Sequence, residues 1–300
     1  MSTLVNETVT RMFIEKIEER RAAGENVSAP WRKLWNPALG ADRNLVSNKP
    51  YRGSNVFITA AQGFGSPFWA TAKQIVGAGG SIKLQADGKR VPYTPIVLWV
   101  FPDEAQKAAG RFPFVKFFQV WNVEQTDGLE ELAASKLAEH AGAVVNPIEA
   151  AQAIVDGWHG KPVTTFGSAR AAYNPSKDSI VMPDLQAFES AEAFYSTYFH
   201  ELAHSTGHRT RLNRDGVVNV ASFGSHAYSE EELVAEMTAG MLAGHSAIDT
   251  PEIVENTSAY LDHWLKVLKA NPDILVAAGG QAQKAVDMIR NYKWEKAVEK

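Results

Sequence analysis

The sequence predicts an α+β protein, in which a basic α+β domain is followed by a mostly helical domain with a small sheet. β-branched and aromatic runs broken by Pro and Gly mark the first part of the chain, whereas helical patterns dominate the second. The two parts also carry opposite net charge. Because 300 residues suit about two domains, we expect domains at 1–125 and 126–300.

The first part opens with a helical pattern and continues into strands. Residues 3–23 repeat apolar side chains at the spacing of one helix face, and Gly24 is a natural helix end. A short helix is expected over 54–62 with Ser54 as its cap, and another over 69–76. Runs rich in β-branched and aromatic residues predict strands at 81–84, 94–101 and 112–123.

The second part is mostly helical by pattern. Helices are expected over 129–140 and 147–158, where Pro147 suits the first helical turn. Extended pieces are expected at 163–166, 169–173 and 179–182. A long helix over about 190–206 follows, and further helices are expected around 229–243, 251–269 and 281–298.

Composition excludes several kinds of chemistry. The chain has no cysteine, so disulfides, zinc–thiolate clusters, iron–sulfur ligation and a thiol nucleophile are excluded. Any metal must therefore be held by His and carboxylate ligands. No stretch approaches the ~18 apolar residues that a membrane span needs. We therefore expect no membrane partner and a cytoplasmic location.

The charge is distributed unevenly along the chain. Residues 1–125 contain 16 Lys and Arg against 10 Asp and Glu, a net charge of +6, whereas residues 126–300 contain 14 against 24, a net charge of −10. Within 28–100, nine basic residues are opposed only by Asp42 and Asp87. This segment is a candidate basic patch.

His200, Glu201 and His204 form an HExxH motif inside the helix expected over 190–206. Positions i and i+4 lie on one helix face, so two imidazoles can bind one metal while Glu201 reaches a metal-bound water. This arrangement is typical of zinc-dependent hydrolases, in which the metal lowers the pKa of its water toward ~7 and the carboxylate takes the proton. The alternative is a buried helix whose histidines only form hydrogen bonds.

Two histidines require at least one more protein ligand, with a further position left for water. His208 continues the i+4 series, but Gly207 is expected to end the helix and turn it away. The longer HExxHxxGxxH pattern fails because Thr210 stands where its last histidine belongs. The remaining source is an acidic helix expected to start at Ser229 as its cap.

That acidic helix offers three candidate glutamates. Glu232 and Glu236 share a face, and their spacing resembles the Glu-xxx-Asp helix of thermolysin-like enzymes. We predict Glu232 as the metal ligand and Glu236 as the carboxylate that orients a ligating histidine from outside. Glu231 is the main competitor as ligand, and a solvated helix start is the alternative for all three acids. One divalent ion is expected, zinc first and manganese as the alternative.

Two further features of the second part are open. The apolar segment 179–183 suits either an edge strand that holds an extended peptide substrate or an ordinary core strand. The group that would stabilise an oxyanion is not identified by its pattern, and the candidates are His226, Tyr228 and His245.

The first part of the chain interleaves aromatic and basic residues. Sixteen of the 30 Phe, Trp and Tyr residues fall within 1–125. Such interleaving suits single-stranded DNA, because bases stack on aromatic faces while Lys and Arg follow the phosphates. The alternative is a set of core aromatics beside a solvated charged face. The candidate DNA-binding residues are Trp31, Arg32, Lys33, Arg43, Lys49, Tyr51, Arg52, Asn55, Lys73, Lys83 and Lys89.

Several blocks together resemble a known family, the ArdC-type anti-restriction proteins of conjugative plasmids. In the first part the blocks are 29–31, 48–55, 69–74 and 118–125, and in the second they are 200–208, 211–214 and 231–236. The resemblance implies an amino-terminal single-stranded-DNA-binding domain, shared with TraC-type plasmid primases, and a zincin-like metallopeptidase domain. It also implies a role in shielding incoming DNA from host restriction enzymes.

Two functions of different class follow. In the first, the basic domain recruits single-stranded DNA and the metal domain hydrolyses peptide bonds, with a restriction protein or another DNA-bound protein as substrate. In the second, the chain is a DNA-binding protector whose metal site is structural or vestigial. A nuclease is disfavoured because one HExxH metal suits acyl chemistry better than two-metal displacement. Mimicry of DNA by charge is disfavoured by the basic first part.

Overall fold

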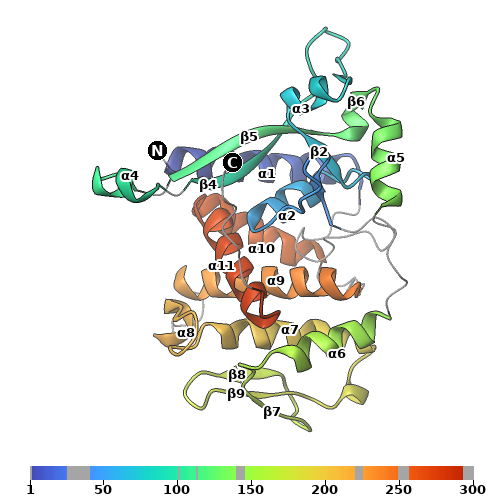
Figure 1. The fold of residues 1–300 in the computed structure, drawn as a ribbon. Helices are drawn as coiled ribbons and strands as arrows, with labels where there is room; N and C mark the ends of the chain where they lie inside the picture. Colours follow the sequence, from blue (N-terminus) through green and yellow to red (C-terminus); the bar gives the residue numbers. More distant parts are fainter. Residues whose placement is uncertain are drawn as a thin grey trace. The chain divides into compact units, whose positions relative to one another are not determined.

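The computed structural model describes residues 2–25, 41–100, 102–112, 114–139, 146–219, 226–248 and 257–292. Helices and strands mix along the chain (Figure 1), which confirms the predicted α+β class. The contacts divide the chain into two compact units. The first contains the described residues up to 139 together with 257–277, and the second contains those from 146 to 248 together with 278–292.

Helix α1 (Ser2–Ala22) confirms the predicted opening helix. Its apolar residues recur on one face, where Val9, Phe13 and Ile17 are almost completely buried. Gly24, with a φ of 80°, lies just past the end of the helix, where a left-handed conformation suits glycine.

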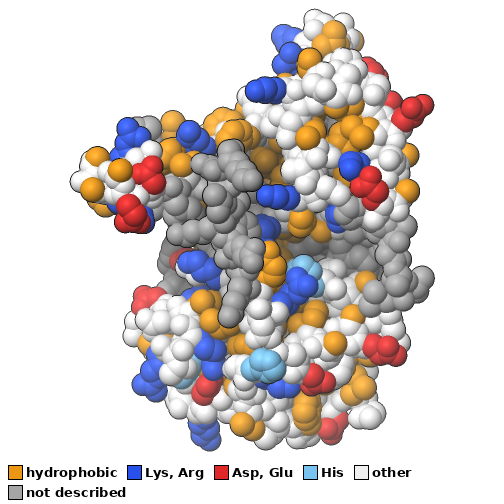
Figure 2. Space-filling model, in the orientation of Figure 1, with side chains coloured by type: hydrophobic (Ala, Val, Ile, Leu, Met, Phe, Trp, Pro, Cys, Tyr) orange, Lys and Arg blue, Asp and Glu red, His pale blue; other side chains and the backbone are white. Residues whose placement is uncertain are grey.

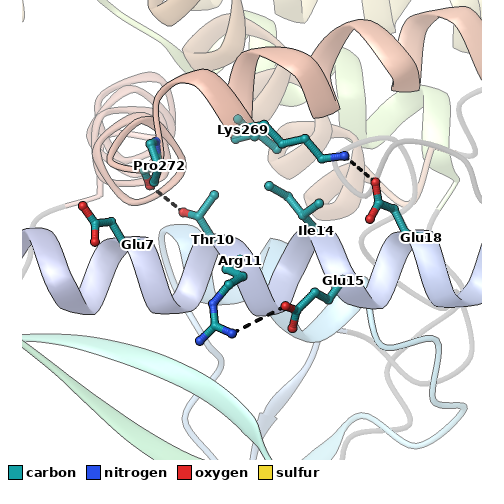
Figure 3. Close-up of a pocket in the computed structure, with 9 residues that line it drawn as sticks. Glu7, Thr10, Arg11, Ile14, Glu15, Glu18, Lys269 and Pro272 are labelled. Atoms are coloured by element: carbon teal, nitrogen blue, oxygen red, sulfur yellow. Dashed lines mark hydrogen bonds and ion pairs between the residues drawn. The ribbon is translucent and has the colours of Figure 1, made fainter.

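Helix α10 (Thr257–Ala270) packs against α1 within the first unit. Arg21 of α1 pairs with Asp262 at 2.7 Å. A shallow pocket of about 290 Å³ lies beside these helices (Figure 3), and there Lys269 Nζ lies 2.6 Å from a carboxylate oxygen of Glu18. Polar contacts therefore supplement the apolar packing between the two helices.

A four-stranded sheet in the order β1-β2-β5-β4 forms the centre of the first unit. β1 and β2 are parallel, and the other pairs are antiparallel. A separate two-stranded ladder joins β3 and β6, and the strands predicted within 81–123 are confirmed. The bounds are β1 (Arg43–Asn44), β2 (Phe68–Ala70), β3 (Ser81–Ile82), β4 (Thr94–Val100), β5 (Phe114–Asn122) and β6 (Thr126–Asp127).

The helix predicted over 69–76 is wrong in its first part. Trp69 and Ala70 belong to β2, where both are buried and pair with β5. Helix α3 (Ala72–Gly77) begins only after them, because Thr71 and Gln74 form a capping box at its start. Packing in the sheet therefore overrides the helical pattern of the first two residues.

Helix α2 (Ser54–Ala60) confirms the short helix but not its cap. Gly53, at φ 61°, occupies the capping position, and Ser54 is the first helical residue and is buried. The chain reaches this helix through a left-handed backbone conformation, which glycine adopts without steric cost.

One hydrophobic core cluster of the first unit lies between the sheet and helices α3 and α5 (Glu130–Ala138). Helix α5 contributes Leu132, Ala133 and Leu137 to this core. The domain boundary between 125 and 126 stays a prediction, and α5, which follows it, packs on the first unit. The short helices α4 (Glu104–Ala108) and η1 (Val123–Gln125) complete this unit.

The second unit is built mainly from helices. Asn146 caps α6 (Pro147–Gly157) by accepting a hydrogen bond from the Ile148 backbone N–H. Pro147 is the first helical residue, as predicted. Helices α6, α7 (Ala191–Thr206) and α9 (His226–Ser246) pack against one another. The short helices η2 (Leu185–Ala187) and α8 (Asp215–Val218) connect them.

A three-stranded sheet in the order β7-β9-β8 lies against α7. The strands are β7 (Val163–Thr165), β8 (Ala172–Asn174) and β9 (Ser179–Val181). β9 is central, parallel to β7 and antiparallel to β8. The interpretation of 179–183 as an edge strand for peptide substrate is therefore wrong, and the buried Ile180 and Met182 favour the core-strand alternative.

Two further helices differ from their predicted bounds. Helix α9 begins three residues before Ser229, which therefore lies in its first turn instead of capping it. Helix α11 (Ile274–Ile289) begins earlier than the predicted residue 281, at a turn that buries Leu275 and Val276. It ends at Ile289, so residues 290–292 of the helix predicted over 281–298 are not helical, and 293–298 lie outside the described residues. Within the described ranges, no helix is both long and apolar enough to cross a membrane.

Candidate metal centre

Helix α7 presents the HExxH motif. Ser190 caps it by accepting a hydrogen bond from the Ala193 backbone N–H at 3.1 Å, and the helix ends at Thr206. Its apolar side chains, including Phe199 and Leu202, are buried, so the helix is anchored in the core. The two histidines one turn apart, His200 and His204, point their Nε2 atoms toward one another at 3.0 Å.

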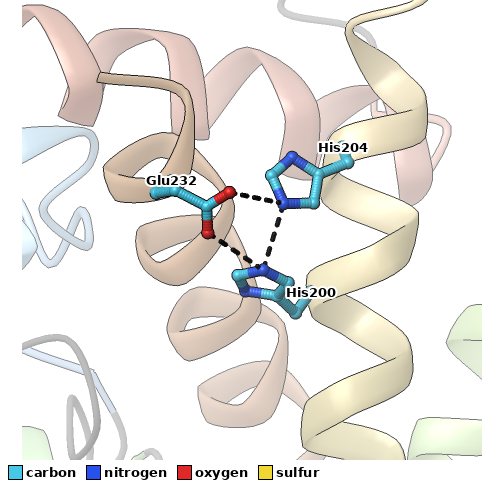
Figure 4. Close-up of side chains that lie close together, drawn as sticks. All are labelled: His200, His204 and Glu232. Carbon is cyan, nitrogen blue, oxygen red and sulfur yellow. Dashed lines mark hydrogen bonds and ion pairs between the residues drawn. The ribbon is translucent and has the colours of Figure 1, made fainter. Parts of the chain in front are cut away.

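Glu232 of α9 completes the predicted set of three ligands. Its Oε2 lies 3.6 Å from His200 Nε2 and its Oε1 lies 3.6 Å from His204 Nε2. Figure 4 shows the carboxylate facing both imidazoles, and one ligand atom from each residue lies within 4.8 Å of the others. The donor set is two imidazoles and one carboxylate, which fits a divalent ion of the zinc type.

The outer nitrogens of the two imidazoles face two further glutamates of α9. Glu231 Oε1 lies 3.0 Å from His204 Nδ1, and Glu236 Oε1 lies 3.8 Å from His200 Nδ1. A carboxylate at Nδ1 holds the proton there and leaves the Nε2 lone pair for a metal. Glu231, the competitor as ligand, thus lies on the outer side of His204 within hydrogen-bond distance, whereas Glu236 faces the outer side of His200 from beyond that distance.

The carboxylates also set the electrostatics of the centre. Burial lowers the pKa of His200, but the hydrogen bond with Glu232 and the charges of Glu236, Glu201 and Glu232 outweigh it and raise this pKa to about 9. The centre therefore favours a positive charge at this position. The same negative charges would stabilise a bound divalent cation.

Glu201 is buried and its carboxylate is held in place. The backbone N–H of Tyr173, in β8, donates to Glu201 Oε2 at 2.7 Å. The sheet therefore fixes the orientation of the one acidic residue that the motif places beside His200. Sequence reasoning missed this contact, because nothing in the pattern of residues 169–173 indicates it.

Arg214 is the main functional candidate that sequence reasoning missed. Its guanidinium donates to both carboxylate oxygens of Glu231, each at 2.8 Å. It also donates to Thr206 Oγ1 at 2.6 Å and to the Ala203 carbonyl at 2.8 Å. These contacts lower the pKa of Glu231 despite its burial, so the glutamate stays charged beside His204. The arginines within 211–214, shortly after the HExxH motif, were the sequence signal that could have indicated a partner for the glutamates.

The segment after the motif is fixed in the same way by Arg211. It donates to the Ser205 carbonyl at 2.7 Å and forms a two-point ion pair with Asp178. His208 lies beside Thr210 Oγ1 at 2.8 Å, away from the three ligand atoms, as the helix end at Gly207 predicts. His245 contacts Arg290, and the side chains of His226 and Tyr228 lie outside the described part of the chain.

The candidate DNA-binding residues differ in accessibility. Trp31, Arg32 and Lys33 lie outside the described residues. In Figure 2, Lys and Arg side chains lie scattered among hydrophobic and neutral ones on the visible face. Exposed candidates are Lys49, Lys73, Lys83 and Lys89, and half-buried ones are Arg43, Tyr51, Arg52 and Asn55.

The half-buried candidates have internal contacts. Arg43 Nε donates to the Ala41 carbonyl, and burial raises the pKa of Tyr51 well above its usual range. The Asn55 amide forms two hydrogen bonds, of 2.7 and 2.8 Å, with the backbone of Val97 in β4. These contacts favour structural roles for Arg43, Tyr51 and Asn55. Among the exposed lysines, Lys83 donates to the Glu124 carbonyl and Lys89 pairs with Asp87.

An HExxH helix whose two imidazoles face a glutamate from a second helix defines a zincin-type metal centre. The family model of a zincin-like metallopeptidase matches residues 149–281, and that of the N-terminal domain of anti-restriction factor ArdC matches residues 4–121. This chain therefore belongs to the ArdC-type family, with an ArdC N-terminal domain followed by a zincin-like domain.

Solved structures and curated relatives agree with this assignment. Crystal structures of the antirestriction protein ArdC from plasmid R388, Mn(II)-bound and metal-free, match with TM-scores of 0.68 and 0.67 at 28% identity, over 96% of this chain and 97% of theirs. A DNA primase TraC from Escherichia coli is 32% identical over 93% of this chain but only 27% of its own length. The uncharacterized protein y4eC of Sinorhizobium fredii is 27% identical over 96% of this chain and 92% of its own length. The chain thus spans about a quarter of the primase.

Proposed function

We propose that this chain is a plasmid-type anti-restriction protein that binds single-stranded DNA through its first unit and carries a metal-dependent hydrolase in its second. The observation that carries the proposal is the occurrence, in one chain, of an ArdC N-terminal domain and an HExxH helix whose two histidines face Glu232. The similarity to an antirestriction protein and to plasmid primases supports the role in DNA transfer. Such a protein would act in the cytoplasm, where restriction occurs.

His200, His204 and Glu232 would hold one divalent ion. The two imidazoles and one carboxylate suit zinc, and they also accept manganese, which the R388 protein binds. When bound, the ion would polarise a carbonyl oxygen and make a water molecule more acidic. Glu231 and Glu236 would hold the two imidazoles with Nε2 toward the ion.

Glu201 would act as the general base. The Tyr173 backbone N–H holds one of its oxygens, which orients the carboxylate, and a glutamate at this position of the motif takes a proton from the attacking water. The same carboxyl would then deliver that proton to the leaving amine. Peptide bonds are the substrate class that this chemistry suits, and the expected substrate is a restriction protein or another DNA-bound protein.

The second candidate function is that of a DNA-binding protector whose metal centre only stabilises the fold. It is favoured by the tight fixing of α7 and α9 through Arg214 and Glu231, which would hold the centre together whether or not chemistry occurs there. The two functions differ in what they require of Glu201.

The decisive experiment compares the wild type with Glu201→Gln in metal content, single-stranded DNA binding and protection of DNA from restriction. Gln keeps an oxygen that can accept from Tyr173 N–H, so the fold and the metal should be retained. We expect protection to be lost while DNA binding remains. Exposed Glu189 lies just before α7, and Glu189→Gln is the matched control that should behave as the wild type. If Glu201→Gln still protects fully, protection rests on DNA binding alone.

A further inference from the structure

The β4–β5 hairpin has one partly covered face, on which Trp99 and Phe117 remain 43% and 37% exposed, and a second face that exposes Leu98, Phe114 and Phe118. In the antiparallel register Val97 and Val115 lie on the same face, are buried, and belong to strands that contact α1 and α2. The alternating residues point the other way. Leu98 lies opposite Lys116, and Phe118 lies opposite Ile96. We call the set Leu98, Phe114, Lys116 and Phe118 the outer hairpin face.

The outer hairpin face exposes large apolar side chains. Leu98 is 53% exposed, Phe114 is 39% exposed and Phe118 is 41% exposed. Phe112, at the start of the returning segment, is 81% exposed. Large apolar side chains that gather on an open surface mark an interaction site more often than isolated ones do.

The charge of this face points to an anionic partner. Lys116 is the one charged residue within strands β4 and β5, and no carboxylate occurs in either strand. Its Nζ lies over the Phe114 ring, 5.3 Å from the ring centre. An aromatic ring beside a lysine can take a base on the ring and a phosphate on the ammonium group.

The outer edge of β4 cannot accept a further strand, which argues against a second copy of this chain as the partner. Addition of a strand would need the outward-pointing backbone groups of β4. Pro95 lacks an N–H, and the Asn55 amide already occupies both the N–H and the carbonyl of Val97. The edge is therefore blocked, whereas the aromatic face beside it remains open.

We propose that Phe114 and Phe118 stack on unpaired bases of single-stranded DNA and that Lys116 contacts the phosphate backbone between them. The inference deepens the proposed function by assigning its DNA contacts to a surface outside the basic segment 28–100. Four residues of a strand separate the two rings by roughly 14 Å, so each takes its own base. Bases inside a duplex are already stacked, so the face selects single strands.

The test uses the full-length chain with Phe114→Leu and Phe118→Leu, which keep an apolar side chain and remove the ring. Binding of a labelled oligothymidine is measured by fluorescence anisotropy at several salt concentrations. Each variant should bind roughly 5- to 150-fold more weakly with an unchanged salt slope, because the slope counts phosphate contacts. Lys116→Gln should instead lower that slope by about 0.7.

The matched control is Val76→Ser, which removes an exposed apolar side chain on α3 and should bind as the wild type. If both leucine variants bind like the wild type while substitution of the exposed lysines weakens binding, the hairpin assignment is wrong and the proposed function stands. If the wild type does not bind single strands, both fail. If the leucine variants change the oligomeric state and not the DNA affinity, the face joins copies of the chain and the assignment is overturned.

Discussion

Substitution of Arg214 by Met tests whether the buried ion pair behind His204 maintains the fold of the metal centre. The side chains of Arg214 and Glu231 are only 6% and 7% exposed. Arg214 also donates to the last turn of α7, at Thr206 Oγ1 and the Ala203 carbonyl. Met retains the length and the apolar contacts of arginine, so the change removes mainly the charge and its hydrogen bonds.

The expected loss follows from what remains beside Glu231. Removal of one partner of a buried ion pair typically costs about 3–5 kcal/mol, because the other charge is left buried. His204 Nδ1 still lies 3.0 Å from Glu231 and compensates in part. We therefore expect the free energy of unfolding to fall by about 3 kcal/mol, the lower end of that range.

Urea unfolding of metal-free protein, followed by circular dichroism, measures this loss. The exposed Arg209→Met is the matched control and should change stability by less than about 0.5 kcal/mol. The double variant Arg214→Met with Glu231→Gln should lose less than the sum of the single variants, because no buried charge is left unpaired. A loss below about 1 kcal/mol for Arg214→Met alone would refute the reasoning.

Two further predictions concern a close contact and a titrating group. A Cβ added at Gly207 would lie 2.5 Å from Val217 Cγ2, so Gly207→Ala should lower the free energy of unfolding by about 1–3 kcal/mol in the same urea titration. The helical Gly280 has no atom within 4 Å of an added Cβ, so Gly280→Ala should instead raise the free energy of unfolding by up to about 1 kcal/mol. Burial raises the pKa of Asp42 from its ordinary 3.8 to about 6, so the folded state binds more protons than the unfolded chain between these values, and stability should fall as pH rises through this window. In calorimetry from pH 4 to 7, Asp42→Asn should lack this part of the pH dependence, and an identical profile for both proteins would contradict the assignment.

The features that local pattern determines could be predicted from the sequence. The HExxH helix, the helix break at Gly207 and the strands expected at 94–101 and 112–123 depend on side-chain period and on nearby residues. The choice of Glu232 over Glu231 followed from the likeness of its spacing to the Glu-xxx-Asp helix of thermolysin-like enzymes, and the structure places the Glu232 carboxylate 3.6 Å from both Nε2 atoms.

The features that depend on distant contacts could not be predicted. Trp69 and Ala70 carry a helical pattern but pair with β5, which is some fifty residues away in the chain. The central position of β9 depends on β7 and β8 closing over both of its edges. The hydrogen bond from the Tyr173 backbone to Glu201 involves a group that every residue type carries, so no sequence signal marks it.

Three glutamates of α9, Glu231, Glu232 and Glu236, take different positions around the two histidines of α7. Neighbouring residues on a helix differ by about 100° in direction, so Glu231 and Glu232 reach the same histidine from different sides. Glu231 meets the Nδ1 side of His204, and Glu232 meets its Nε2 side. Glu236, one turn after Glu232, meets the Nδ1 side of His200. Each imidazole thus lies between two carboxylates of one helix, so a shift of α9 along α7 would change the surroundings of both histidines together. Arg214 donates to residues of both helices and therefore restrains such a shift.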